Sequence, residues 1–170
     1  RRFNTAGTEK PGTPHENEVD DYQQTHYQAF FNHQKNRNLN FNLGLHYTNG
    51  KGFFEQYKAD QLLESYGISP VENSINVGDT IYTDLIQESD LIRRRWLDND
   101  FYGTTFSINY TSDSRKLDFV FGGAWNQYDG RHFGEVTWAR FASDSEVGQL
   151  YYDNDATKKD FNIFGKTNYQ

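Results

Sequence analysis

The chain has 170 residues and a net charge of −7, with no cysteine and no methionine. The missing cysteines exclude disulfides and thiolate metal sites, and the acidic balance disfavours nucleic acid, which binds basic faces. Aromatic residues make up 17% of the chain although its mean hydropathy is −0.95. A polar chain rich in rings is typical of a sheet with one face in lipid and the other in water. A carbohydrate-binding β-sandwich can share this composition.

The first 20 residues are polar and contain two glycines and two prolines, so we predict a loop there. Position 1 is not methionine, and we expect the chain to lie inside a longer precursor. No apolar run approaches the roughly 20 residues that a transmembrane helix needs. Any membrane crossing would therefore use strands.

Five segments show the period of a β-strand, in which successive side chains point to opposite faces. The pattern is clearest in residues 39–48, where Leu and aromatic residues alternate with Asn, Gly, His and Thr. Phe30 and Phe164 break the alternation of their segments. The predicted strands lie near residues 22–34, 39–56, 100–111, 117–128 and 160–170.

The connections alternate between short and long. Residues 35–38 and 112–116 are short polar turns, whereas long loops are predicted near 57–99 and 129–159. Weak helical periodicity occurs within the first long loop, over 57–68 and 83–97. Outer-membrane barrels have short periplasmic turns and long extracellular loops. We predict an all-β, antiparallel up-and-down meander in which residues 1–170 form about five strands of a larger transmembrane β-barrel.

Aromatic residues recur at both ends of the predicted apolar faces. This arrangement suggests the two interfacial girdles of a membrane barrel, although strands favour aromatic residues in any case. The residues at the loop end are Tyr47, Tyr102 and Trp125, and those at the turn end are Phe31, Tyr110 and Tyr169.

No catalytic constellation is evident, so we expect no enzyme activity, metal or cofactor. The five histidines form neither an i, i+4 pair nor a His-Glu-x-x-His motif. Asp153, Asp155 and Asp160 suggest either a calcium site or a solvated loop. Rings that stack on sugars, beside cations that hold carboxylates, favour the long loops as ligand sites. The candidate ligand-binding residues are Trp96, Tyr128, Arg131, His132, Trp138, Arg140, Tyr151 and Tyr152.

Motifs along nearly the whole chain resemble the barrel of TonB-dependent outer-membrane receptors of the Bacteroidetes type. The motifs are Asn4–Gly7 (NTAG), Glu18–Tyr22 (EVDDY), His26–Gln28 (HYQ), Leu45–Thr48 (LHYT), Gly50–Lys58 (GKGFFEQYK), Trp96–Gly103 (WLDNDFYG), Gly122–Gly130 (GGAWNQYDG), His132–Val136 (HFGEV) and Asp160–Tyr169 (DFNIFGKTNY).

The resemblance implies a 22-stranded barrel in the cell outer membrane, with an N-terminal plug and a TonB box that this chain lacks. It implies TonB-driven import of a scarce, bulky nutrient: a ferric siderophore, a corrinoid or an oligosaccharide. The implied partners are that nutrient, the protein's own plug, the TonB complex, lipid and a surface lipoprotein.

Two other functions remain open from the residues: a soluble β-rich carbohydrate-binding module, and a passive outer-membrane barrel without a plug. Isolated in water, the chain should aggregate through its strand edges, or bury Leu43, Phe106 and Phe121 against another surface.

Overall fold

The computed structural model describes residues 2–3, 19–114, 116–143 and 145–169. The predicted loop at the N-terminus falls mostly on residues 4–18, outside the described residues. Within the described part, the chain is almost entirely β-strand and contains no α-helix. This confirms the all-β prediction.

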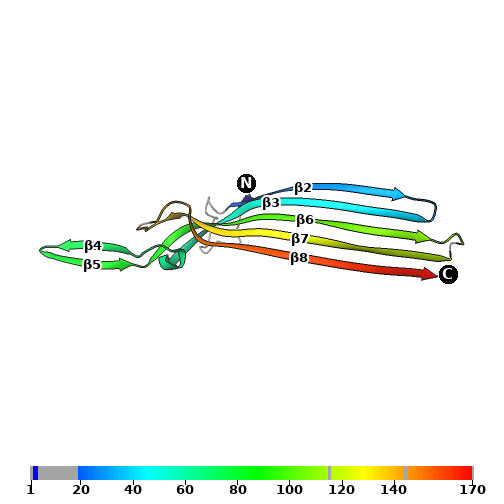
Figure 1. The fold of residues 1–170 in the computed structure, drawn as a ribbon. Coiled ribbons are helices and arrows are strands. Elements are labelled where there is room, and N and C mark those ends of the chain that lie inside the picture. Colours follow the sequence, from blue (N-terminus) through cyan, green and yellow to red (C-terminus); the bar gives the residue numbers. More distant parts are fainter. Residues whose placement is uncertain (1, 4–18, 115, 144, 170) are drawn as a thin grey trace. The chain divides into compact units, whose positions relative to one another are not determined.

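The long strands form an antiparallel meander, in which neighbours along the chain are also neighbours in the sheet (Figure 1). The sheet order is β1-β2-β3-β6-β7-β8. The strands β4 and β5, which follow β3 and precede β6 in the chain, form a separate two-stranded sheet. The strands are β1 (Arg2–Phe3), β2 (Val19–Gln34), β3 (Leu39–Leu62), β4 (Val71–Val77), β5 (Thr80–Ile86), β6 (Glu88–Thr111), β7 (Leu117–Ala139) and β8 (Gln149–Tyr169). A short 3-10 helix, η1, spans Leu63–Tyr66.

The strands run much further than their sequence patterns predict. The predicted loop 57–99 contains the end of β3, η1, the β4–β5 hairpin and the first part of β6. The predicted loop 129–159 is strand except for the connection between Ala139 and Gln149. The helical periodicity was also misleading, because 57–68 holds only η1 and 83–97 is almost entirely strand. Where the strands extend past their alternating segments, side chains on neighbouring strands contact one another. Such contacts join residues far apart in the chain and cannot be read from the local sequence.

The two short turns are held by side chains that replace missing backbone partners. The Asn36 Oδ1 atom accepts hydrogen bonds from the backbone N–H groups of Asn38 and Leu39, both at 2.9 Å. The Asn38 side chain donates to the Thr111 carbonyl and to Asp113 Oδ1, at 2.7 Å each. The turn after β2 is thereby joined to the turn after β6.

The chain divides into two compact units, to which the long strands all contribute. Unit 1 comprises Arg1–Gln23, Lys51–Leu97 and Arg131–Asn154, and unit 2 comprises Gln24–Gly50, Asp98–Gly130 and Asp155–Gln170. Unit 1 has a small apolar core in which η1 packs against β6 and β7. The core residues are Leu63, Tyr66, Ile68, Leu91 and Val136.

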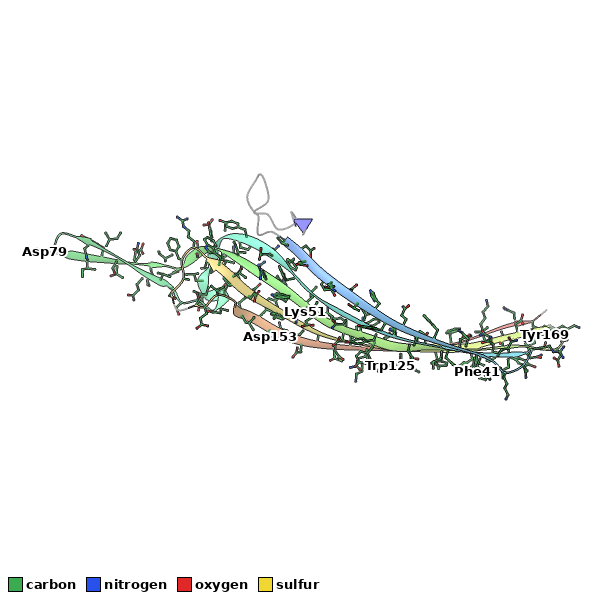
Figure 2. The ribbon with its side chains drawn as sticks, turned by 90° about the horizontal axis from the view of Figure 1, so that it is seen from above. Phe41, Lys51, Asp79, Trp125, Asp153 and Tyr169 are labelled. Atoms are coloured by element: carbon green, nitrogen blue, oxygen red, sulfur yellow. The ribbon has the colours of Figure 1, made fainter. Side chains whose placement is uncertain are left out.

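In unit 2 the strands lie in one layer, with side chains projecting from both surfaces (Figure 2). One surface, the apolar face, carries stacked rings such as Tyr27 and Tyr47, whose centroids are 6.1 Å apart. The other, the amide face, is polar, and there Asn42 Nδ2 donates to Ser107 Oγ at 2.9 Å. The alternation in the sequence therefore predicted which residues share a face.

A glycine allows two polar side chains to meet across an intervening strand of unit 2. His46 Nε2 on β3 lies 3.1 Å from Asn126 Oδ1 on β7, and Gly103 on β6 lies beneath this hydrogen bond. A Cβ atom at Gly103 would stand 2.5 Å from Asn126 Oδ1 and 2.9 Å from His46 Nε2. Only glycine fits there without displacing both side chains.

Candidate functional site

Of the eight predicted ligand-binding residues, seven lie in unit 1 and one, Tyr128, lies in unit 2. They do not converge on a single site. Most of them bond to other protein groups, which leaves few of their polar atoms for a ligand.

Trp96 belongs to a row of rings across three strands of unit 1. Its ring centroid lies 4.6 Å from that of Phe53 and 5.6 Å from that of Phe133, with which it is nearly parallel. The indole Nε1 donates to Glu135 Oε1 at 2.9 Å. Both faces and the polar atom of Trp96 are therefore engaged within the protein.

A row of charges lies beside this row of rings. Arg94 Nε is 2.6 Å from Glu55 Oε2, its Nη1 is 3.7 Å from Glu135 Oε1, and its guanidinium lies over the Phe53 ring. The Glu55 side chain is 6% exposed, so its charge is removed from water and needs this partner. None of these three charged residues was predicted from the sequence. Each stands two positions from a ring of the neighbouring row, and this spacing, which places both on one face of a strand, could have indicated them.

Arg131 forms an ion pair with Asp153. Its Nε and Nη2 atoms donate to the two carboxylate oxygens at 2.8 and 2.6 Å, and its guanidinium lies over the Phe133 ring. The hydrogen bonds from Arg131 lower the pKa of Asp153. Arg131 is committed to Asp153, and Asp153 is one of the three carboxylates of the calcium hypothesis.

The neighbouring tyrosines 151 and 152 differ sharply. The Tyr152 hydroxyl accepts a hydrogen bond from Arg95 Nε at 3.3 Å. The Tyr151 ring packs against Tyr66 of the core, and its hydroxyl is buried with no partner among the described residues. Burial raises the pKa of Tyr151. Tyr151 therefore serves the core, contrary to the ligand role suggested by its exposed-loop prediction.

Three other candidates are also partly engaged. The Tyr128 hydroxyl donates to Asn99 Oδ1 at 2.6 Å in unit 2. The Arg140 guanidinium lies 5.2 Å from the Phe141 ring centroid, and the half-buried His132 also has an interaction partner.

Trp138 is the exception among the eight. Its side chain is 45% exposed, and no described residue bonds to its indole N–H. It lines a hollow of about 160 Å³ formed by the end of β7 and the connection to β8. The other lining residues are Val136, Thr137, Ala139, Ala142, Ser145, Glu146 and Val147.

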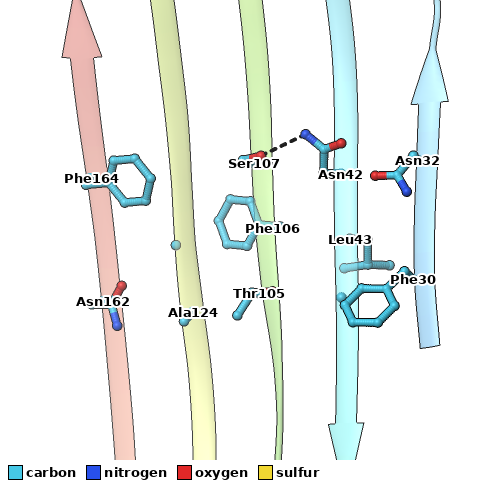
Figure 3. A pocket seen from close by; sticks show the side chains of 12 residues that line it. Phe30, Asn32, Asn42, Leu43, Thr105, Phe106, Ser107, Ala124, Asn162 and Phe164 are labelled. Atoms are coloured by element: carbon cyan, nitrogen blue, oxygen red, sulfur yellow. Dashed lines mark hydrogen bonds between the residues drawn. The ribbon is translucent and has the colours of Figure 1, made fainter. Parts of the chain in front are cut away.

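A second hollow, of about 320 Å³, lies in unit 2 (Figure 3). Its polar side chains come from the amide face and are uncharged: Asn32, Asn42, Thr105, Ser107 and Asn162. Phe30 and Phe164, the two residues that break the strand alternation, also line it and are 73% and 52% exposed. The irregularity in the sequence was thus the signal for this hollow.

The loop end of the apolar face in unit 2 has a polar border. The Tyr47 hydroxyl donates to Asp100 Oδ1 at 2.6 Å, and the Tyr102 hydroxyl donates to Asp129 Oδ2 at 2.9 Å. Trp125 packs edge-on against Tyr102 at 6.0 Å. Rings and carboxylates therefore form adjacent rows at this border.

Among the described residues, no three His, Asp or Glu side chains are grouped so that they could hold a metal ion. No helix in the described part of the chain is long and apolar enough to cross a membrane. No family model, curated protein or solved structure matches the chain.

Proposed function

We propose that the chain is part of the barrel wall and outer loops of a TonB-dependent receptor in the bacterial outer membrane, which imports a scarce, bulky nutrient. The observation that carries the proposal is the apolar face of unit 2. Large apolar side chains on this face remain exposed, including Tyr27 at 61%, Phe161 at 67% and Tyr169 at 80%.

Such a face needs cover, because soluble proteins rarely expose a contiguous apolar patch of more than a few hundred Å². The opposite face carries amides and hydroxyls. A second sheet packed on the apolar face would also cover the rings, so the preference for lipid rests on the rings and carboxylates that border this face. Lipid against the apolar face and a polar interior against the amide face satisfy both surfaces.

The border of rings and carboxylates supports the same function. Tyr and Trp prefer the membrane interface, where the ring contacts hydrocarbon and the polar atom reaches water. Tyr47 and Tyr102 direct their hydroxyls to Asp100 and Asp129, as expected of side chains at that depth.

The receptor assignment itself rests on the sequence motifs. It carries with it the plug, the TonB complex and a surface lipoprotein as proposed partners, and it involves neither an enzyme reaction nor nucleic acid. The two strand edges of the sheet would pair with further strands of the same barrel.

Site-directed labelling of the full-length parent in intact cells tests the topology. Because this chain has no cysteine, single cysteines can be placed at Val147, in the connection between β7 and β8, and at Arg37, in the short turn after β2. Val147 is 88% exposed and Arg37 lies in the exposed turn after β2, so both thiols can react if a reagent reaches them. Other cysteines in the parent would be replaced first.

A membrane-impermeant maleimide should label position 147 in intact cells, and position 37 only after the outer membrane is opened. Equal labelling in intact cells, or recovery of the protein in the soluble fraction, would instead favour a soluble β-rich binding module. A passive barrel would give the receptor's labelling pattern but no TonB-dependent uptake.

A further inference from the structure

We propose that the hollow beside Trp138 binds one sugar ring of a neutral oligosaccharide. This inference rests on the proposed receptor function and narrows its nutrient to one class. The indole offers an exposed apolar ring and an N–H donor to which no described residue bonds, which suit a pyranose with apolar C–H bonds on its faces and hydroxyls on its rim.

The polar groups of the hollow favour a hydroxyl-rich, uncharged ligand. Glu146 lines it with a carboxylate to which no described side chain bonds, and Ser145 adds a hydroxyl. A carboxylate accepts hydrogen bonds from sugar hydroxyls and repels phosphates and anionic iron chelates. Among the described residues, no Lys or Arg lines this hollow, and none lines the hollow beside Phe30 and Phe164 in unit 2.

The volume limits the ligand to a small group. A hollow of about 160 Å³ suits a group the size of one sugar ring better than a whole corrinoid.

The connection that forms the hollow is fixed by hydrogen bonds within unit 1. Phe141 N–H donates to Ser89 Oγ at 2.9 Å, and Ser143 Oγ donates to the Ser69 carbonyl at 2.9 Å. The Gly148 N–H donates to the Val136 carbonyl at 2.8 Å, with glycine at φ 88°. A site held in place before the ligand arrives loses less entropy on binding.

The test measures binding of maltohexaose, cellohexaose and mannohexaose to the full-length parent in detergent by calorimetry. At least one should bind, and Trp138→Ala should weaken its affinity about tenfold, the loss expected for one ring contact. Glu146→Ala should weaken it by a similar factor. Glu146→Gln, which keeps an acceptor oxygen, should change it less than threefold.

Tyr82→Ala is the matched control, since this ring is 62% exposed in unit 1 but lies outside the hollow. Its affinity should equal that of the unmodified protein. The proposal is overturned if none of the three oligosaccharides binds, or if Trp138→Ala binds them normally. Binding of ferric citrate or cyanocobalamin in place of an oligosaccharide would overturn this inference but would agree with a receptor for another nutrient. Equal labelling of positions 147 and 37 in intact cells would contradict the receptor function itself.

Discussion

The two units differ in whether they bury hydrophobic side chains. Every hydrophobic residue that is buried in the described part of the chain belongs to unit 1, whereas unit 2 has none. Unit 1 also pairs its buried carboxylate with arginine, as a structure in water requires. Unit 2 is a single layer whose exposed rings lie mostly on the apolar face, with Phe30 and Phe164 exposed on the amide face. Unit 1 therefore has an apolar core of its own, whereas the exposed rings of unit 2 are the side chains that the proposed membrane would cover.

The largest expected effect concerns the core of unit 1. Leu91 is fully buried, so Leu91→Ala should remove about 2–5 kcal/mol of stability by leaving a cavity. The loss should be confined to unit 1 and appear as faster proteolysis of the segment between β3 and β6. Ile81→Ala, at a residue that is 68% exposed, is the control. Equal protease resistance of both variants would show that unit 1 does not depend on its core.

Two adjacent residues of β3 test the difference between the faces of unit 2. Leu43→Arg places a charge on the apolar face and should cost about 2–4 kcal/mol if that face contacts the middle of a bilayer. Asn42→Arg places the same charge on the amide face and should cost far less. Urea unfolding of the full-length parent in lipid vesicles measures both. Similar costs would contradict the assignment of lipid to one face.

Tyr151 and Tyr152 offer a smaller contrast within unit 1. Tyr151→Phe removes a buried hydroxyl that has no partner in the described part of the chain, so it should raise the free energy of unfolding by about 1 kcal/mol. Tyr152→Phe removes the acceptor of Arg95 and should lower it slightly. Thermal denaturation of the two variants and of the parent measures both changes in stability. A lower stability of Tyr151→Phe would mean that the Tyr151 hydroxyl has a partner.

The smallest effect concerns the ion pair of Arg131 and Asp153. Because the pKa of Asp153 is lowered in the folded state, its contribution is complete above the ordinary value of 3.8 and is lost as the pH falls below that value. Asp153→Asn should abolish this acid-dependent part. Melting curves between pH 3 and 6 should therefore show the full difference between the variant and the parent above about pH 4, and a difference that shrinks as the pH falls below that value. An unchanged difference at all pH values would exclude this titration.

The fold could be predicted from the sequence better in unit 2 than in unit 1. In unit 2, alternation of apolar and polar residues predicted the strands and their faces, because a period of two residues assigns each side chain to one face of the sheet. In unit 1, residues such as Arg94 and Trp96 lie on strands whose pattern mixes charges with rings, so the sequence predicted loops there. The pairing of Trp96 with Glu135 joins residues 39 positions apart and leaves no local signal. The same limitation explains why most predicted ligand residues bond to the protein instead.

The link between the two turns has an evolutionary consequence. Asn38 fixes β3 against β6 at the end remote from the chain between Leu62 and Glu88. The Asn38 side chain and the bond from the Thr111 N–H to the Asn38 carbonyl therefore align the two strands at this end, whatever the length of that intervening segment. Insertions and deletions can accumulate there without shifting the side chains of unit 2 to the wrong face. Relatives should differ most in the segment from η1 to β5, while an amide persists at position 38.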